Sequence, residues 1–346
     1  MVAPAGPEWR PGLGRPTEDH STLNESPTPQ VSVVVPTRNR APLVSRLLRQ
    51  LVSMDDAAHY EIIVIDEASS DETPQVLSEF AMSHGVRIIR NDVPVGLSAA
   101  RNLGTLAARG PFVAWIDDDD LTAPDRLARQ HRALTTTGLR WSCAARVDID
   151  DDLDVIGHVR CPSGEQLLER LLRINVLPSA GQGLLVDKAL ADAVGGYDES
   201  LPSAEDWDFC IRLAAVADPH MLDEPLVGYR TGVASMSTNT DRMESAIRTV
   251  IAKHSGLMRD ADVTPDWAAI HLSLLTADLL GSRRAASRRA IKALRCEVSP
   301  RNAARCCLVV AAPTWFARRS ARNRREQVPT AWRLAAEQWL AAVRTA

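Results

Sequence analysis

Four consecutive aspartates follow directly on the apolar segment PFVAWI. Carboxylates crowded at the end of a buried strand repel one another and resist removal from water. A divalent cation would offset both effects, and oxygen ligands suit Mg²⁺ or Mn²⁺, held by one or two carboxylates and a substrate phosphate. Because alternate residues of an extended segment point the same way, Asp117 pairs with Asp119, and Asp118 with Asp120. The competing interpretation is a solvated acidic turn, since aspartate also favours turns and helix starts.

A second acidic run, DIDDDLD at residues 148–154, begins with the spacing of an EF-hand loop. Leu153 stands where that loop needs a glycine, and Val159 stands where it needs a bidentate glutamate. We therefore predict a solvated hairpin turn at this place.

The segments before the aspartates alternate between buried strands and helices. Short runs rich in β-branched residues predict strands, and helical periodicity with end signals predicts helices. The predicted strands cover residues 31–36, 61–66, 86–90 and 111–116, and the predicted helices cover residues 41–54, 73–85 and 96–110. Such alternation indicates right-handed βαβ units on a mostly parallel sheet with helices on both faces. We therefore expect a Rossmann-like α/β fold.

Polar loops follow the first, second and fourth of these strands, where open parallel sheets bind their ligands. They are PTRNR at residues 36–40, DEASSDET at residues 66–73 and the aspartate run. The first loop has no GxGxxG, which argues against a dinucleotide dehydrogenase.

Beyond Pro124 the pattern is more mixed. We predict helices at residues 124–138, 164–174 and 204–217, two strands joined by the acidic turn at residues 140–160, a strand with a short helix and a glycine turn at residues 181–200, and a last strand at residues 223–230. From about Asp241 onward the whole pattern is helical.

Length and composition suggest three segments. With 346 residues, 45% of them hydrophobic, the chain is long enough for roughly two domains. We expect a disordered segment at residues 1–30, an α/β domain at residues 31–240 and a helical region at residues 241–346. No apolar run is long enough to span a membrane, and the N-terminus lacks the pattern of a secretory signal. The six cysteines show no CxxC pair, which is typical of reduced thiols in the cytoplasm.

The net charge of −4 is distributed unevenly. Residues 283–325 contain thirteen Lys or Arg and one acid, a balance of +12, so the rest of the chain carries −16. Trp315 and Phe316 beside Arg318 and Arg319 are typical of a helix in a membrane interface. Alternatively, these helices pack on the acidic body. Nucleic acid is not expected as a partner, because no aromatic platform is interleaved with the charges.

Six motifs in order carry a family resemblance. They are VSVVVPTRNR, IIVIDEASSDET, VGLSAARNLG, WIDDDDLTAPDRL, GGYDESL and AEDWDFCIRLA. Together they resemble a family 2 glycosyltransferase of the GT-A fold, from about Val31 to Ser237. The resemblance implies transfer of a sugar, with inversion, from a nucleotide donor to an acceptor hydroxyl, with Mn²⁺ or Mg²⁺ as cofactor.

The resemblance also implies site residues. The residues implied in donor binding are Pro36, Thr37, Arg38, Asn39, Arg40, Asp66, Asp71, Arg101, Asp117 and Asp118. Asp119 and Asp117 are implied as metal ligands. Asp206 is implied as the catalytic base, with Glu205 as the alternate. Asp66 matches the acid that reads the base edge, and Arg101 matches the arginine near the donor phosphates or sugar. Asp206 matches the base, and we expect apolar neighbours such as Trp207 to raise its basicity. Without the resemblance, the alternative for the two acids before Trp207 is charge compensation at a helix start.

The chain departs from the family pattern at two places. The usual Asp-Asp-Gly-Ser is here Asp66-Glu67-Ala68-Ser69, and alanine restricts the loop where glycine would not. Many relatives carry a histidine after the Tyr-Arg pair that reaches the metal, and YRTGVASMS has none. The third protein contact to the metal is therefore unassigned, and Tyr229 and Arg230 either close over the diphosphate or simply end a strand.

Two rival functions remain at this stage. A nucleotidyltransferase can share the sheet and the metal acids, but it usually needs a glycine-rich, lysine-bearing first loop. A non-catalytic nucleotide-sugar-binding module would not need both a metal site and a base. We expect a UDP-sugar donor and, as acceptor, a glycan, a glycolipid or a small metabolite. Nearly all of the 40 basic residues are arginine, typical of a GC-rich bacterial source. We expect a cytoplasmic enzyme, with peripheral contact at the inner membrane face if residues 283–325 bind lipid.

Overall fold

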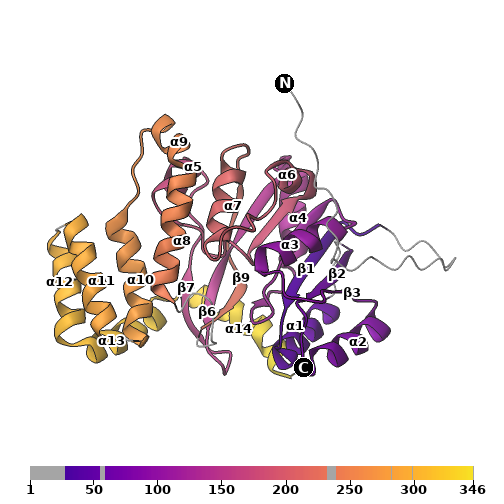
Figure 1. Ribbon diagram of the computed structural model, residues 1–346. Helices are drawn as coiled ribbons and strands as arrows, with labels where there is room; N and C mark the ends of the chain where they lie inside the picture. The colour runs from indigo at the N-terminus through magenta and orange to yellow at the C-terminus, as the bar shows by residue number, and fades with distance from the viewer. Residues whose placement is uncertain (1–27, 55–58, 232–238, 282, 298, 346) are drawn as a thin grey trace.

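The computed structural model describes residues 28–54, 59–231, 239–281, 283–297 and 299–345 (Figure 1). Most of the N-terminal segment expected to be disordered lies outside these residues. The first elements are β1 (Val31–Thr37), α1 (Ala41–Ser53), β2 (Tyr60–Asp66), α2 (Thr73–His84), β3 (Arg87–Arg90), α3 (Leu97–Ala107) and β4 (Phe112–Trp115). Strand β1 pairs in parallel with β2 and β4, and β2 pairs in parallel with β3. The predicted βαβ alternation is confirmed.

The later strands turn this parallel half into a larger mixed sheet. They are β5 (Leu121–Thr122), β6 (Trp141–Ile149), β7 (Val155–Val159), β8 (Leu184–Asp187) and β9 (His220–Arg230). The order is β3-β2-β1-β4-β8-β6-β9-β5, with β7 on β6. Strand β8 runs antiparallel to both β4 and β6, whereas β6 and β9 are parallel. The sequence analysis missed β5.

Helices cover both faces of the sheet, and β1 is therefore buried along its whole length. Val33 and Val35 pack with α1, α2 and α4 (Arg126–Thr137) in one cluster. Val34, which points to the other face, packs with α3, α5 (Leu167–Arg173) and α7 (Glu205–Ala214) in another. The short α6 (Lys188–Ala193) follows β8. The predicted α/β class is confirmed.

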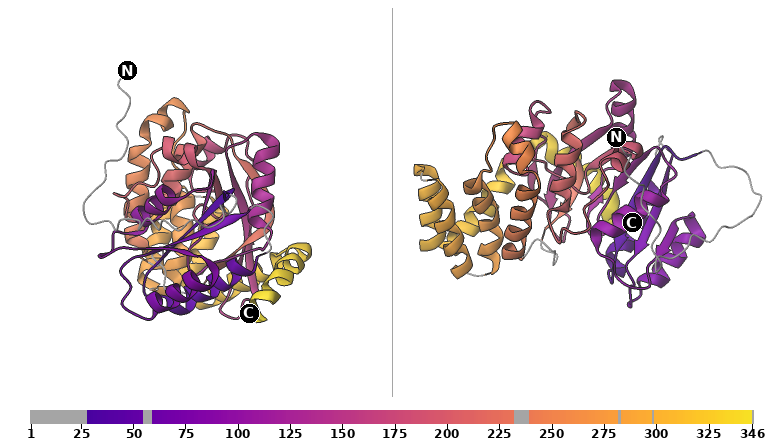
Figure 2. Two further views of the ribbon diagram at one scale, coloured as in Figure 1. Left: turned by 90° about the vertical axis from the view of Figure 1, so that its right-hand side faces the viewer. Right: turned by 45° about the horizontal axis from the view of Figure 1, so that its top comes forward.

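The rest of the chain is helical, as predicted. It forms α8 (Thr240–Lys253), α9 (Ser255–Asp260), α10 (Trp267–Gly281), α11 (Arg283–Cys296), α12 (Pro300–Ala311), α13 (Pro313–Gln327) and α14 (Thr330–Thr345). Helices α8, α10, α11 and α12 stand side by side and extend away from the sheet, while α13 crosses beneath them (Figures 1 and 2). Within the described residues, no helix has the length and apolar character required to cross a bilayer.

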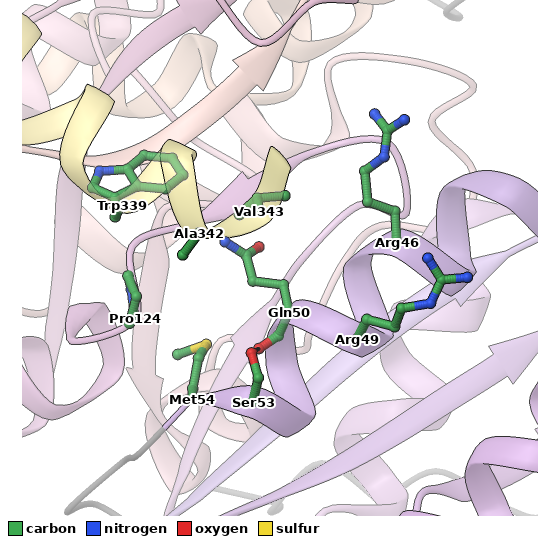
Figure 3. A pocket seen from close by; sticks show the side chains of 9 residues that line it. All are labelled: Arg46, Arg49, Gln50, Ser53, Met54, Pro124, Trp339, Ala342 and Val343. Atoms are coloured by element: carbon green, nitrogen blue, oxygen red, sulfur yellow. Dashed lines mark hydrogen bonds between the residues drawn. The ribbon is translucent and has the colours of Figure 1, made fainter. Parts of the chain in front are cut away.

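Helix α14 returns to the sheet. Its Trp339 and Leu340 are buried against Leu226 and Val227 of β9. A Cβ atom at Gly228 would lie 2.8 Å from the Trp339 ring, so the close packing of α14 on β9 requires glycine at this position. The other side of α14 faces α1 across a cavity of about 120 Å³ (Figure 3).

The acidic run at residues 148–154 forms a hairpin turn between β6 and β7, as predicted. Its carboxylates hold two arginines of the last helices. Arg325 pairs with Asp150 at 2.9 Å, and Arg344 pairs with Asp154 at 2.8 Å. Part of the basic region therefore does pack on the acidic body.

Candidate active site

A cleft of about 470 Å³ opens where β1 and β4 end and α7 begins. Predicted site residues that line it are Pro36, Thr37, Arg38, Arg40, Arg101, Asp117, Asp118, Asp119, Glu205 and Asp206. The lining thus joins the β1 loop, helix α3, the aspartate run and the start of α7, which are far apart in the sequence.

All four aspartates line the cleft, and two of them are nearly buried. Asp118 is 5% exposed and accepts hydrogen bonds from Thr37 Oγ1 and Arg40 Nη1, both at 2.7 Å. Asp120 is 2% exposed and accepts from the backbone N–H of Arg230 at 3.0 Å. The Asp117 and Asp119 side chains are 30% and 16% exposed. Exposure thus alternates along the run, but the segment is a turn, in which the Asp120 N–H donates to the Asp117 carbonyl at 3.1 Å, and not the extended segment that was expected.

Crowding makes the charged form of these carboxylates costly. Burial raises the pKa of Asp118 to about 6, although Arg40 opposes the shift. Burial first, and then repulsion from Asp117, raise the pKa of Asp119. The same two causes raise the pKa of Asp120 well above its usual value. The cleft therefore carries acidic charge that a cation would stabilise.

Asp117 and Asp119 fit a divalent cation by their chemistry. Within the described residues, no group of three or more His, Cys, Asp or Glu side chains is arranged to hold a metal. Mg²⁺ and Mn²⁺ nevertheless bind through one or two carboxylates when phosphates and water complete the shell. Two carboxylates facing a cleft large enough for a nucleotide suit that mode. The stretch at residues 232–238, which lacks the histidine of many relatives, lies outside the described residues.

Arg101 connects the aspartate run to α7. Its Nη2 donates to Asp117 at 2.7 Å, and its Nη1 donates to Glu205 at 2.8 Å. The side chain is 2% exposed and lies over the Tyr197 ring, 5.0 Å from its centroid. Helix α3 brings it there by close packing, because a side chain at Gly104 would overlap Val34 of β1.

The two acids at the start of α7 have different surroundings. Glu205 holds Arg101, whereas Asp206 accepts only from the N–H of Trp207, at 2.7 Å, among the hydrogen bonds of the described residues. Removal from water, and then the neighbouring charge of Glu205, raise the pKa of Asp206 to about 6. The direction is the expected one, but the second cause is the Glu205 charge, and the hydrogen bond from the Trp207 N–H acts to lower the pKa.

Three predicted donor residues do not line the cleft but brace its loops. The Asp66 side chain is 1% exposed, pairs with Arg90 and accepts from the N–H of Ser69 at 3.0 Å. Asp71 accepts from the backbone N–H of Thr73 at 3.0 Å and of Ala41 at 3.3 Å, at the starts of α2 and α1. Asn39 Oδ1 accepts from the Ser70 N–H at 2.7 Å, which ties the first loop to the second. Their roles in donor binding remain predictions.

The sequence analysis missed several lining residues, above all Glu67. Its carboxylate accepts from the N–H groups of Val95 and Gly96 at 2.8 and 2.7 Å and so holds the loop that enters α3. The signal available was its place beside Asp66 in the second motif. Tyr229 and Arg230, for which the sequence left two roles open, also line the cleft. Gln182, Ser203 and Met243, which no motif marked, do so as well.

Ala68 adopts φ +54°, in the left-handed region that glycine enters freely. This is the position at which the family motif carries glycine. The alanine therefore keeps the loop conformation at a cost in backbone strain.

Comparisons with known proteins agree with this geometry. Residues 32–195 match the model of glycosyl transferase family 2. An uncharacterized glycosyltransferase of Haemophilus influenzae is 26% identical over 224 residues, which cover 63% of this chain and 74% of that protein. The succinoglycan biosynthesis protein ExoO of Rhizobium meliloti is 33% identical over 128 residues, 37% of this chain and 34% of that protein.

Two solved structures share the fold. TarS 1-349 of S. aureus, in complex with UDP-GlcNAc, gives a TM-score of 0.54 at 17% identity, over 90% of this chain and 92% of that one. The mannosyltransferase PcManGT of Pyrobaculum calidifontis, in complex with GDP-Man and Mn²⁺, gives 0.53 at 20% identity, over 90% and 86%. The expected GT-A fold is confirmed.

Proposed function

We propose that this chain is a family 2 glycosyltransferase, on the family match at residues 32–195, and that it catalyses a metal-dependent, inverting transfer. The sugar moves from a nucleoside-diphosphate sugar to an acceptor hydroxyl. The observation that carries the proposal is a single cleft lined by Asp117 and Asp119 and, at the start of α7, by a carboxylate of raised pKa, Asp206. A binding module would not need that base, and the first loop lacks the glycine and lysine typical of a nucleotidyltransferase.

The transfer itself needs one base. The acceptor oxygen attacks the anomeric carbon while the bond from that carbon to the β-phosphate oxygen breaks, and Asp206 takes the hydroxyl proton. Attack opposite to the leaving group inverts the anomeric configuration. With a pKa of about 6, Asp206 is ionised at neutral pH yet basic enough to accept a proton. Glu205 is the weaker candidate, because its carboxylate is engaged with Arg101.

The charge that develops on the leaving diphosphate needs cationic groups. Asp119 and Asp117 would hold the divalent ion, which when bound stabilises that charge. Arg40 lies on one side of the aspartate run, where its Nη1 donates to Asp118 and Asp119. Arg101 lies on the other side and fixes Asp117. Both guanidinium groups add positive potential to the donor end of the cleft.

The donor is a nucleotide sugar, with UDP as the first nucleotide to test and GDP as the second. TarS and PcManGT, which share this fold, were solved with UDP-GlcNAc and GDP-Man respectively. The acceptor is a glycan, a glycolipid or a small metabolite. Residues 31–240 form the catalytic domain under this proposal, with α8 contributing Met243 to the cleft.

A donor screen followed by two variants tests the proposal. A nucleotide sugar that binds with Mn²⁺ raises the melting temperature. At a ligand concentration of about a hundred times its Kd, binding stabilises the folded state by about 2.7 kcal/mol. Asp119→Asn should lose the metal-dependent part of that shift. Asp206→Asn should keep the shift but lose about a hundredfold or more of donor hydrolysis and transfer.

The control is Asp192→Asn, which removes a carboxylate that is 54% exposed on α6, outside the cleft. It should leave both readouts unchanged. Full turnover in excess chelator would contradict the metal assignment. A loss of donor affinity in Asp206→Asn with normal turnover at saturation would make Asp206 a binding residue.

A further inference from the structure

Helix α11 presents a basic face to solvent. Arg284, Arg288, Ile291 and Arg295 recur at spacings of four, three and four residues, so they share one face, and all are exposed. The opposite face of the helix carries the buried alanines Ala286, Ala290 and Ala293. Packing against α10 and α12 uses those alanines and leaves the arginine face uncovered.

Helix α13 repeats this pattern with an aromatic residue. Trp315, Arg318, Arg319 and Arg322 lie on one face by the same spacing, and no residue of α13 is buried. Trp315 is 49% exposed, and the Arg319 guanidinium lies 5.2 Å from its ring centroid. The tryptophan is therefore shielded on one side by a cation and open on the other.

Helix α12, which connects these two, exposes aliphatic side chains. Leu308 is 40% exposed and Val310 is 53% exposed, whereas Cys306 and Val309 point into the small core of this lobe. Helices α11 and α12 lie side by side at the end of the molecule away from α2 (Figures 1 and 2). We call the exposed side chains of these three helices the α11–α13 surface.

Ion pairs account for only some of the basic residues. Arg289 is 3% exposed and pairs with Asp278 and Glu244, and Lys292 also pairs with Glu244. Arg325 pairs with Asp150 of the hairpin turn. In the described part of the chain, exposed arginines without a carboxylate partner remain on α11 and α13. They are Arg284, Arg288, Arg295, Arg318, Arg319 and Arg324.

We propose that the α11–α13 surface docks on a lipid bilayer that contains anionic phospholipid. Arginine heads can pair with lipid phosphates while Trp315, Leu308 and Ile291 enter the interfacial region. A second copy of the chain is disfavoured as occupant, because the two faces would carry like charge. Nucleic acid is disfavoured because the uncharged side chains are mainly aliphatic and offer no row of stacking platforms.

Docking would hold the protein at the surface in which lipid-linked acceptors lie. The inference concerns binding and does not depend on the proposed reaction. If the reaction is as proposed, membrane docking favours the glycolipid among the three acceptor classes.

Vesicle co-sedimentation of the full chain tests the surface. Vesicles of phosphatidylcholine alone are compared with vesicles in which about one third is phosphatidylglycerol, at low and high salt. We expect binding only to the anionic vesicles and a loss of binding at high salt. The combined variant Arg284→Glu, Arg288→Glu, Arg295→Glu should lower the partition coefficient at least about a hundredfold, since each removed cation counts for about fivefold and the added carboxylates are repelled by anionic lipid.

The matched control reverses three exposed arginines elsewhere, with Arg49→Glu, Arg109→Glu and Arg259→Glu. It has the same change in net charge and should bind at least tenfold more tightly than the α11 variant. Trp315→Ser should weaken binding without changing its salt dependence. Equal loss in both triple variants would overturn the assigned surface. Absence of binding at low salt, or tighter binding to a short RNA than to the vesicles, would overturn the proposal.

Discussion

The two arginines on either side of the aspartate run are held in opposite ways. Arg101 is 2% exposed, bridges Asp117 and Glu205, and packs on Tyr197. Arg40 is 33% exposed and contacts Asp118 and Asp119 through a single nitrogen, Nη1. Arg101 is enclosed among its partners, whereas Arg40 lines the cleft with a third of its side chain in water. The same residue type thus has a buried role on one side of the aspartate run and a partly exposed one on the other.

The largest effect is expected from breaking the rigid side. Arg101→Ala leaves two carboxylates without their buried partner, which costs about 3–5 kcal/mol of unfolding free energy and about a hundredfold or more in transfer. Arg101→Lys should rescue little, because one ammonium cannot reach both acids with fork geometry. Urea unfolding and donor hydrolysis measure the two losses. Arg109→Ala, exposed just after α3, is the control, and equal behaviour of the two variants would refute the difference between buried and open arginines.

The next effect is in pH and concerns the acids next to Arg101. With the pKa of Asp206 raised to about 6, kcat/KM at pH 5 should be about tenfold below its value at pH 7. Glu205→Gln removes a charge that raises this pKa, so the acid limb should move to lower pH. Pre-steady-state rates measured from about pH 4.5 to 8 define the acid limb of the pH profile. The control Asp192→Asn should leave this limb in place.

The sign for stability follows from the same shift. Between the usual value of 3.8 and about 6, the folded state binds more protons at Asp206 than the unfolded state does. The free energy of unfolding contributed by this group is therefore highest below that window and falls as pH rises through it. Asp206→Asn should flatten this part of the stability profile, and an unchanged slope would mean that Asp206 has an ordinary pKa.

The open side should give a smaller and different response. Arg40→Ala should lower the unfolding free energy by about 1 kcal/mol or less, since a third of the side chain is in water. Donor KM should rise about fivefold with a smaller change in kcat, as for loss of uniform binding. Arg129→Ala is the matched control, since Arg129 is 40% exposed and paired with Asp125 and Glu224 away from the cleft. A loss of several kcal/mol in Arg40→Ala would erase the contrast with Arg101.

The smallest effect is expected in the loop behind Arg40. Ala68→Gly relieves about 1 kcal/mol of left-handed strain but adds a similar entropy to the unfolded chain. The net change in stability should stay within about 0.5 kcal/mol. Ala81→Gly, within helix α2, provides the contrast and should cost about 1 kcal/mol. Equal losses in the two variants would show that Ala68 is not strained.

The parallel half of the fold was predictable because each element has its own local signal. β1 is an uninterrupted apolar run, and α2 begins at Thr73-Pro74 and ends at Gly85 in the left-handed conformation. Topology then placed the loops of Arg40 and Asp119 at one edge, whereas Arg101, on α3, was assigned to the site by the family resemblance alone. Strand β5 is only two residues long and exists by pairing with β9, so no local pattern marks it.

The partners inside the site were less predictable. The ion pair between Arg101 and Glu205 joins residues 104 positions apart, and nothing local to either one indicates it. Asp66 and Asp71 have the residue type of ligand contacts, but in the structure their carboxylates are occupied by loop and helix N–H groups. Residue type and strand-end position indicate where a site lies, whereas the division between binding and bracing depends on tertiary contacts.

The return of α14 to the sheet also orders events during synthesis. Trp339 donates to the carbonyl of Pro225, 114 residues earlier in the chain, and covers the apolar face of β9. The described residues that line the cleft all precede α9, so a nascent chain can assemble its catalytic groups well before α14 leaves the ribosome. Until then Leu226 and Val227 lack their cover, and exposed strand faces of this kind invite aggregation and chaperone binding. The order of synthesis therefore includes an interval in which the cleft is formed and the sheet is still open at β9.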